Sequence, residues 1–234
     1  MIHSIFQMPD SQQFRLVTFD VYTALFDIEG SLMPVIQQLL KEQVDAIELV
    51  RLWRQKQLEY ALISNSLQQG RVPFAVITRR ALDYALSRVQ VDLSESSRHS
   101  LVAEWDRLQL WPESGEVLRE VKKRGYSVGL LSNGDEEMLR RLASHLPITC
   151  DHIFASEQAG YYKPHPSLYE LPLKALGLTS DQVLHIAGSS TDVMGAKAAG
   201  LPCAWSNRKH DRVLDDGYQA DYEFENLLGL LDVI

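Results

Sequence analysis

The feature that most constrains the fold of this chain is a regular alternation of short β-prone runs and helical segments in its C-terminal half. Each β-prone run is followed by a stretch in which apolar residues recur with helical spacing. The predicted strands cover residues 127–131, 152–155, 183–187 and 202–205, and the predicted helices cover residues 113–124, 166–176 and 191–199, with another beginning at Asp135. Because the connections are short, this alternation predicts an α/β fold in which a parallel sheet carries helices on both faces.

One more strand lies near the N-terminus, and a long helical insertion separates it from the others. The run 16–19 is short, apolar and β-prone, and it leads directly into Asp20. From residue 31 to residue 111 the apolar residues follow helical spacing, and the pattern predicts no strand there. We therefore predict a core built from residues 1–30 and 112–234, with a helical domain of residues 31–111 inserted after the first strand.

Composition excludes several functional classes. The chain has 234 residues, of which 45% are hydrophobic and 23% charged, as in ordinary globular domains. Its 23 basic and 31 acidic residues give a net charge of −8, which argues against a nucleic-acid partner or an anionic membrane surface. No apolar stretch or N-terminal leader pattern suggests a membrane span or secretion. The acidic balance favours small-molecule partners, and because Cys150 and Cys203 are isolated, we expect a reducing, cytoplasmic environment.

Polar side chains follow several predicted strands at the points where these strands end. Asp20 follows the first strand, Ser132 and Asn133 follow the strand 127–131, and Asp192 lies at the start of a helix. Lys163 lies in a loop of Gly, Tyr and Pro residues. Each alone has a simple explanation, because such residues commonly cap helices and form turns. Since the carboxyl ends of parallel strands meet at one edge of a sheet, we expect them to form one ligand site.

These strand ends carry four sequence motifs, and the insertion carries a fifth. The motifs are Phe19-Asp20-Val21-Tyr22, Leu131-Ser132-Asn133-Gly134, Tyr162-Lys163-Pro164, the segment 188–195 around Asp192, and Leu52-Trp53-Arg54-Gln55-Lys56-Gln57-Leu58-Glu59-Tyr60 in the insertion. Together they resemble the haloacid dehalogenase superfamily, and the fifth motif most resembles the hydrolytic (S)-2-haloacid dehalogenases, the type II enzymes. The resemblance implies a Rossmann-like parallel-sheet core with an inserted α-helical cap, and a hydrolase that acts on the carbon–halide bonds of small 2-haloacids.

The resemblance further implies that Asp20 is the nucleophile and forms an aspartyl ester with the substrate. A carboxylate at a strand tip near Lys163 stays ionised, which suits this role. Tyr22 stands two residues beyond Asp20, where the phosphatase branch has an acid that protonates the leaving alkoxide. A halide departs without a proton, so the aromatic residue at this position favours dehalogenation.

The resemblance also implies roles for residues that the pattern alone would leave as surface or core positions. Arg54 would meet the departing halide with Asn133 beside it, and Ser132 would bind the anionic group of the substrate. Lys163 would support the charges of Asp20 and the substrate, Tyr169 would orient site groups, and Asp192 would position Lys163 and the hydrolytic water. The expected substrate-binding residues are Tyr22, Gln55, Leu58, Phe74 and Ser189.

The chain departs from the dehalogenase pattern in two motifs. Family members usually have Gly and Thr where this chain has Thr23 and Ala24, so the hydroxyl has moved by one position. Adjacent residues of a tight loop point in different directions, and the pattern therefore predicts a weaker hydrogen bond to Asp20. In the fourth motif Ala187 and Ser189 replace residues that are often Ser and Asn, which predicts a slower enzyme or an altered substrate range.

Two other functions stay open on the residues alone. One is a magnesium-dependent phosphatase, in which Asp20 and Asp192 would hold the ion. The other is a diverged, non-catalytic binder of small anions, which Ala24 and Ala187 favour. The dehalogenase hypothesis predicts no cofactor and no metal, a small anionic substrate and, by resemblance, a homodimer; only the phosphatase hypothesis requires Mg²⁺.

Overall fold

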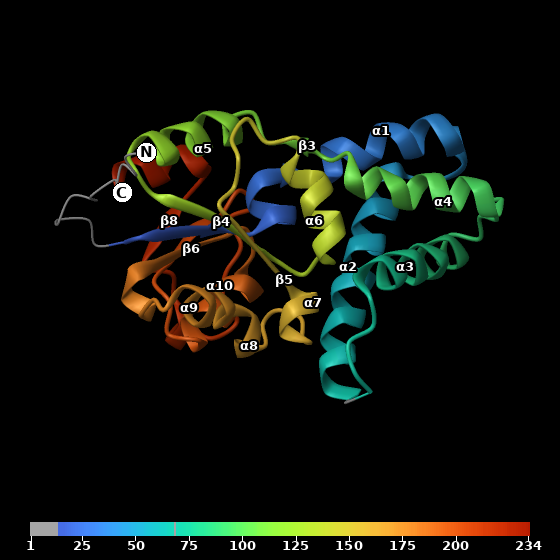
Figure 1. The fold of residues 1–234 in the computed structure, drawn as a ribbon. Helices are drawn as coiled ribbons and strands as arrows, with labels where there is room; N and C mark the ends of the chain where they lie inside the picture. The colour runs from blue at the N-terminus through green and yellow to red at the C-terminus, as the bar shows by residue number, and fades with distance from the viewer. Residues whose placement is uncertain (1–13, 68) are drawn as a thin grey trace, which may run out of the picture.

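The core is a six-stranded parallel sheet in a computed structural model that describes residues 14–67 and 69–234 (Figure 1). The first 13 residues of the predicted core lie outside the described residues. The strands are β1 (Leu16–Phe19), β4 (Ser127–Ser132), β5 (His152–Ala155), β6 (Val183–Ala187), β7 (Cys203–Ser206) and β8 (Tyr222–Phe224). Their spatial order is β5-β4-β1-β6-β7-β8, which confirms the predicted parallel α/β sheet. The strand expected at 202–205 begins one residue later, and the sequence pattern missed β8.

Strand β1 lies at the centre of the sheet, and its position places the end of the strand in the middle of the carboxyl edge. It pairs with β4 through Leu16 and Ser127, and with β6 through Leu16 and Val183. All four β1 side chains are buried, as expected of a strand covered on both faces. Asp20 therefore emerges between the ends of β4 and β6, where open α/β sheets bind their ligands.

Helices cover both faces of this sheet (Figure 1). They are α5 (Ser114–Lys123), α6 (Glu136–Ala143), α7 (Ser156–Ala159), α8 (Pro166–Tyr169), α9 (Leu171–Leu176) and α10 (Ser190–Ala198). Helix α5 lies on one face, and α8, α9 and α10 lie on the other. The single helix expected over 166–176 is wrong, because Pro172 sits in the first turn of α9, where its missing N–H breaks the preceding helix.

Helices α1 to α4 stand to one side of the sheet and form the cap (Figure 1). They are α1 (Ile28–Leu40), α2 (Ala46–Leu67), α3 (Phe74–Arg88) and α4 (Glu95–Ala103). The helical pattern begins at Ile28, earlier than expected, and the prediction of no strand over residues 31–111 is wrong, because β3 (Gln109–Leu110) lies at its end. Strands β2 (Phe26–Asp27) and β3 pair antiparallel where the chain enters and leaves the helical insertion, and at two residues each they are too short to show a period in the sequence.

Several short helical turns complete the described chain. They are η1 (Val21–Leu25), η2 (Lys41–Gln43), η3 (Glu104–Asp106), η4 (Ser180–Gln182), η5 (Asp216–Tyr218) and η6 (Leu227–Asp232). Among the helices of residues 14–67 and 69–234, none is both long enough and apolar enough to cross a lipid bilayer.

Hydrogen bonds tie the cap to the loops at the carboxyl edge of the sheet. Asn65 of α2 bonds both the backbone N–H and the backbone C=O of Tyr162, at 2.9 and 2.8 Å. Asp135, after β4, accepts the backbone N–H of Phe74 at the start of α3 and pairs with Arg71. These contacts hold α2 and α3 over the strand ends, so that cap residues and core residues face one another.

Candidate active site

Asp20 is held at the tip of β1 by the turn that follows it. Its Oδ2 accepts the backbone N–H of Thr23 at 2.9 Å and the Thr23 hydroxyl at 2.7 Å. The segment after Asp20 is a π-helical turn, η1, which wraps around the carboxylate and brings the third residue back onto it. The expectation that Thr23 would reach Asp20 only weakly is therefore wrong. Gly188 permits this turn, because a Cβ there would lie 2.3 Å from the backbone nitrogen of Ala24.

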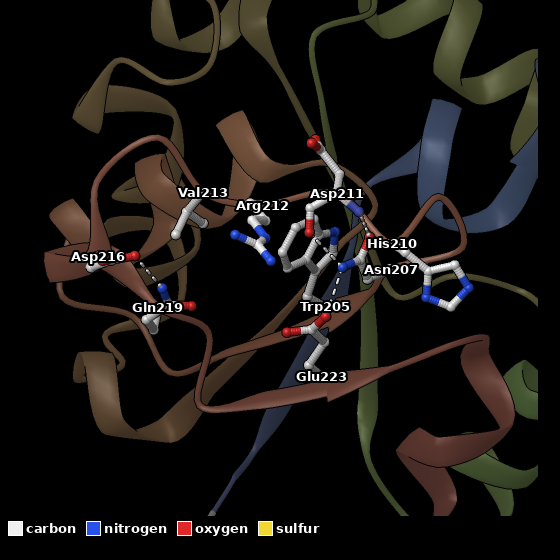
Figure 2. A pocket seen from close by; sticks show the side chains of 9 residues that line it. All are labelled: Trp205, Asn207, His210, Asp211, Arg212, Val213, Asp216, Gln219 and Glu223. Carbon is white, nitrogen blue, oxygen red and sulfur yellow. Dashed lines mark hydrogen bonds between the residues drawn. The ribbon is translucent and has the colours of Figure 1, made fainter.

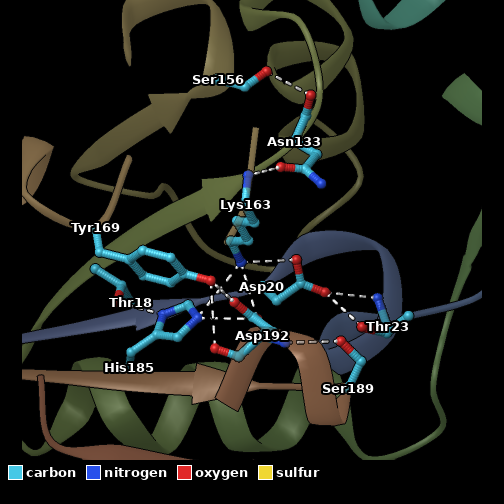
Figure 3. Close-up of polar contacts among 10 residues, drawn as sticks. All are labelled: Thr18, Asp20, Thr23, Asn133, Ser156, Lys163, Tyr169, His185, Ser189 and Asp192. Carbon is cyan, nitrogen blue, oxygen red and sulfur yellow. Dashed lines mark hydrogen bonds and ion pairs between the residues drawn. The ribbon is translucent and has the colours of Figure 1, made fainter. Parts of the chain in front are cut away.

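Lys163 bridges the two predicted acids of the site (Figure 3). Its Nζ donates to Asp20 Oδ1 at 3.1 Å and to Asp192 Oδ2 at 3.0 Å, and all three side chains are buried. Burial alone disfavours an ammonium, but the charges of Asp192 and Asp20 outweigh it and raise the pKa of Lys163 above its ordinary value of 10.5. The two carboxylates therefore favour the charged form of Lys163 between them.

Asp192 accepts hydrogen bonds on both carboxylate oxygens. The Tyr169 hydroxyl donates to Oδ1 at 2.8 Å, while Oδ2 lies 3.0 Å from Lys163 Nζ and 3.1 Å from His185 Nε2. Burial would raise the pKa of the Asp192 carboxyl, but Lys163 and His185 hold it well below its ordinary value of 3.8. These partners favour the ionised form of Asp192.

His185 is a site residue that sequence reasoning missed. It lies in the middle of β6, is fully buried, and contacts Asp192, Lys163 and Thr18 (Figure 3). The available signal was a lone titratable residue inside the otherwise apolar run Val183–Ala187, since a buried polar side chain needs hydrogen-bonding partners.

Ser132 and Asn133 lie at the end of β4, as predicted. The Asn133 Oδ1 accepts the backbone N–H of Lys163 at 2.7 Å, and its backbone C=O accepts the hydroxyl of Ser156 at 2.6 Å. These contacts use the oxygen of the Asn133 amide and leave its NH₂ group for other acceptors (Figure 3). The Ser132 hydroxyl is buried and has no hydrogen-bonding partner among the described residues.

Arg54 projects from cap helix α2 into an aromatic enclosure. Its guanidinium carbon lies 5.5 Å from the ring centre of Tyr22 and 5.6 Å from that of Trp105. Its Nη1 donates to Gln57, whose own amide donates to Thr78 at 2.6 Å. Burial lowers the pKa of Arg54, against the raising effect of Asp20. Its Nε is buried without a hydrogen-bonding partner in the described chain, so one donor remains free for a ligand.

A cleft of about 810 Å³ opens between the cap and the core. Its walls include four of the predicted substrate-binding residues, namely Tyr22, Gln55, Leu58 and Ser189, and it also reaches Thr23 and Arg54. Phe74 does not line it. The Phe74 ring is fully buried behind Tyr22, with the two ring centres 5.5 Å apart, so it contacts the pocket wall from within the core.

A smaller hollow of about 400 Å³ adjoins this cleft (Figure 2). Trp205, Asn207, His210 and Asp211 line both spaces, which lie beyond the end of β7. Asn207 closes the loop between them by donating its amide to the backbone C=O of Asp211 at 2.9 Å. The hollow therefore extends the same cleft along the carboxyl edge of the sheet.

Comparison with known proteins identifies the family. A model for haloacid dehalogenase-like hydrolases matches residues 14–200. The chain belongs to this family. Haloacetate dehalogenase H-2 of Moraxella sp. (strain B) is 32% identical over 199 residues, which cover 84% of this chain and 87% of that protein. The (S)-2-haloacid dehalogenase of Pseudomonas sp. (strain YL) is 31% identical over 219 residues, 93% of each chain.

A solved structure agrees with these sequence relatives. The L-2-haloacid dehalogenase from Xanthobacter autotrophicus with chloropropionic acid covalently bound has a TM-score of 0.85 and 25% identity, and the match covers 94% of this chain and 98% of that one. The family and the α/β fold expected from the sequence are confirmed. The chain is a hydrolase of the haloacid dehalogenase type.

Proposed function

We propose that this hydrolase removes the halogen of small 2-haloacids through an ester on Asp20. The observation that carries the proposal is the Asp20 carboxylate itself, which is buried beside Lys163 and held by Thr23, with Tyr22 where a phosphatase would place an acid. The names of the relatives, which are haloacetate and 2-haloacid dehalogenases, support the same substrate class.

In the first step a carboxylate oxygen of Asp20 attacks the carbon that bears the halogen. The new C–O bond forms as the C–halogen bond breaks, and the halide takes the bonding pair without needing a proton. Arg54 is a buried cation on the cap side of the cleft, and its Nε, which has no hydrogen-bonding partner among the described residues, suits a departing anion. Rigid Thr23 and Lys163 contacts orient Asp20 before the substrate arrives, which lowers the cost of reaching the transition state.

The anionic group of the substrate is expected to bind near the end of β4. The buried Ser132 hydroxyl has no partner in the described residues, and the NH₂ group of Asn133 is unused by the bonds that fix its oxygen. A buried donor without an acceptor is costly in a folded protein. A bound carboxylate would satisfy both donors and remove that cost.

In the second step water adds to the carbonyl carbon of the Asp20 ester. The C–O bond between that carbon and the substrate oxygen then breaks, which returns Asp20 to a carboxylate and releases a 2-hydroxy acid. Over both steps a 2-haloacid and water give a 2-hydroxy acid, a halide ion and a proton. Asp192 is too strongly hydrogen-bonded to be an effective base, so its part is to fix Lys163 beside the ester.

The hydrogen bonds of the two site acids support a reaction without magnesium. A magnesium ion needs free carboxylate oxygens in octahedral geometry. Asp20 and Asp192 each have both oxygens engaged by hydrogen-bond donors. Among the described residues no group of three or more His, Cys, Asp and Glu side chains is arranged to hold a metal. An ion would also place a second positive charge against the Lys163 ammonium.

Tyr22 disfavours phosphatase chemistry on separate grounds. Burial is the main cause that raises its pKa above the ordinary value of 10.0. Its hydroxyl is therefore a poor donor of a proton to a leaving alkoxide. Hydrolysis of a phosphate monoester would lack its general acid at this position.

The proposal is tested by measuring halide release from 2-chloro- and 2-bromo-acids, with and without a chelator. We expect release that the chelator does not change, and no release by the Asp20→Asn variant. Phosphate release from a phosphate monoester that a chelator abolishes, without halide release, would favour the phosphatase. Binding of a 2-haloacid without turnover would favour the non-catalytic anion binder.

A further inference from the structure

His185 sits beneath the site as part of a hydrogen-bonded chain that crosses two strands. Thr18 of β1 and His185 of β6 are paired in register, and the Thr18 Oγ1 lies 2.9 Å from His185 Nδ1. The opposite ring nitrogen, Nε2, lies 3.1 Å from Asp192 Oδ2. Both strand residues are fully buried, so the ring lies inside the packed sheet with its two nitrogens held by these contacts (Figure 3).

The partners of the ring indicate where its Nε2 hydrogen points. The carboxylate oxygen of Asp192 is an acceptor only, so Nε2 must carry the hydrogen that faces it. Nδ1 then accepts the hydrogen of the Thr18 hydroxyl, which can rotate to donate. The alternative tautomer would set the Nε2 lone pair against Asp192 Oδ2 at 3.1 Å, which is repulsive.

The contacts of His185 with Asp192 also fix the position of the Lys163 ammonium group. Lys163 Nζ lies 3.5 Å from His185 Nε2, next to its own bond with Asp192 Oδ2. His185 and Lys163 thus approach one oxygen of Asp192 from two directions, while Tyr169 holds the other oxygen. Without His185 the Asp192 carboxylate could rotate toward Lys163, and the ammonium could follow it away from Asp20.

We propose that His185 is a positioning residue for hydrolysis of the Asp20 ester, acting through Asp192. The inference rests on the proposed dehalogenation and deepens it. His185 hydrogen-bonds Asp192 and lies 3.5 Å from Lys163. During the attack on carbon the Thr23 turn still holds Asp20 Oδ2 and the Asp20 charge still attracts Lys163, whereas in the ester that charge is gone and Asp192 alone attracts the ammonium. Loss of the His185 hydrogen bond therefore slows the second step more than the first.

The test separates the two steps in variants that remove the hydrogen bond between His185 and Asp192. His185→Phe keeps a flat ring of similar size and removes both ring nitrogens. The double variant Thr18→Val/His185→Phe also removes the hydroxyl that the single change would leave unpartnered, which protects the fold. His185→Gln is the conservative control, because its amide N–H can reach Asp192 as Nε2 does. Thermal unfolding confirms that each variant is folded.

Rapid-quench measurement with 2-chloropropionate gives the rate constant for halide release in one turnover, and mass spectrometry of the quenched protein follows the ester. In both Phe variants we expect ester hydrolysis to slow by about tenfold or more, which is a typical effect of losing the hydrogen-bonding partner of a site residue. Halide release should change by less than about threefold. The ester then accumulates. His185→Gln should restore hydrolysis to within about threefold of the wild-type rate.

Equal slowing of both steps, or no change in either, overturns the role of His185 while leaving the dehalogenase proposal intact. A merely structural effect would lower the fraction of active protein, and so reduce the two amplitudes together without trapping the ester. A wild-type protein that releases no halide overturns the proposed function, and the inference falls with it.

Discussion

Replacing Arg54 by Met should separate catalysis from stability more sharply than any other change at this site. Methionine has a similar length and fills the space between Tyr22 and Trp105, but it carries no charge. Only a guanidinium that acts on the departing halide gives a large loss of activity in a protein that stays folded. Arg54→Met therefore tests the role of the charge rather than the packing.

The structural terms for this substitution nearly cancel. The native protein loses two cation–π contacts, each about 0.5–2 kcal/mol, and one charge-assisted hydrogen bond to Gln57 of about 1.5–3 kcal/mol. The substitution also removes the cost of burying a cation, which is several kcal/mol and agrees with the lowered pKa of Arg54. We expect the free energy of unfolding to change by no more than about 2 kcal/mol in either direction.

The expected loss of activity is far larger. Removing a group that stabilises developing charge costs about 10²–10³-fold in turnover. A protein with about 5 kcal/mol of stability remains more than about 99% folded after losing 2 kcal/mol, so unfolding cannot account for such a loss. Halide release at saturating 2-chloropropionate and urea unfolding are measured on the same preparations. Arg88→Met, at the exposed end of α3, makes the same chemical change away from the cleft and should keep full activity.

The reasoning fails if Arg54→Met releases halide at a rate within about tenfold of the wild type. It also fails if the loss of activity follows a loss of more than about 3 kcal/mol of unfolding free energy, because Arg54 would then be mainly structural. A change confined to KM at unchanged kcat would make Arg54 a substrate-binding residue with no part in the departure of the halide.

Three further predictions test the core side of the site. Thr23→Val should slow halide release by about tenfold to a hundredfold, because Asp20 loses a charge-assisted hydrogen bond. Thr23→Ser keeps the hydroxyl and should keep most of the rate. Equal rates of halide release in the two variants would contradict an orienting role for the hydroxyl. Tyr169→Phe should lower turnover by about tenfold and leave substrate affinity unchanged, as measured by steady-state kinetics; a changed KM alone would contradict it. The wild type should have a larger free energy of unfolding than Asp192→Asn above about pH 4, and this difference should shrink as the pH falls further, because the pKa of Asp192 is lowered in the folded protein. Urea unfolding that shows a constant difference down to about pH 2 would contradict a lowered pKa.

Features that depend on residues close together in the sequence could be predicted from the sequence alone. Short apolar runs that end in polar residues placed β1, β5 and β6 and brought Asp20, Ser132 and Asp192 to one edge, because parallel strands end together. The division of α8 from α9 was also written in the chain, since Pro172 lacks the N–H that a continuous helix needs. The apolar residues keep helical spacing on both sides of Pro172, so the spacing alone predicts one continuous helix.

Other features depend on contacts between distant residues and were out of reach. The hydroxyl of Thr23 reaches Asp20 because η1 is a π-helical turn packed against Gly188. The residue types in that turn do not predict a π-helical geometry. The place of Phe74 behind Tyr22 follows from how α3 docks onto the core. A buried His185 becomes meaningful only when β6 pairs with β1 and supplies Thr18 as its partner.

The most direct test of the central claim is the mass of the Asp20 peptide after turnover in H₂¹⁸O. Water attacks the carbonyl carbon of the ester, so repeated turnover should place ¹⁸O in the Asp20 carboxylate, and rapid quenching should reveal the ester on the same peptide. Asp20→Asn should release no halide while its urea unfolding shows a folded protein. Label that enters only the 2-hydroxy acid product, with Asp20 unlabelled through many turnovers, would contradict the covalent mechanism.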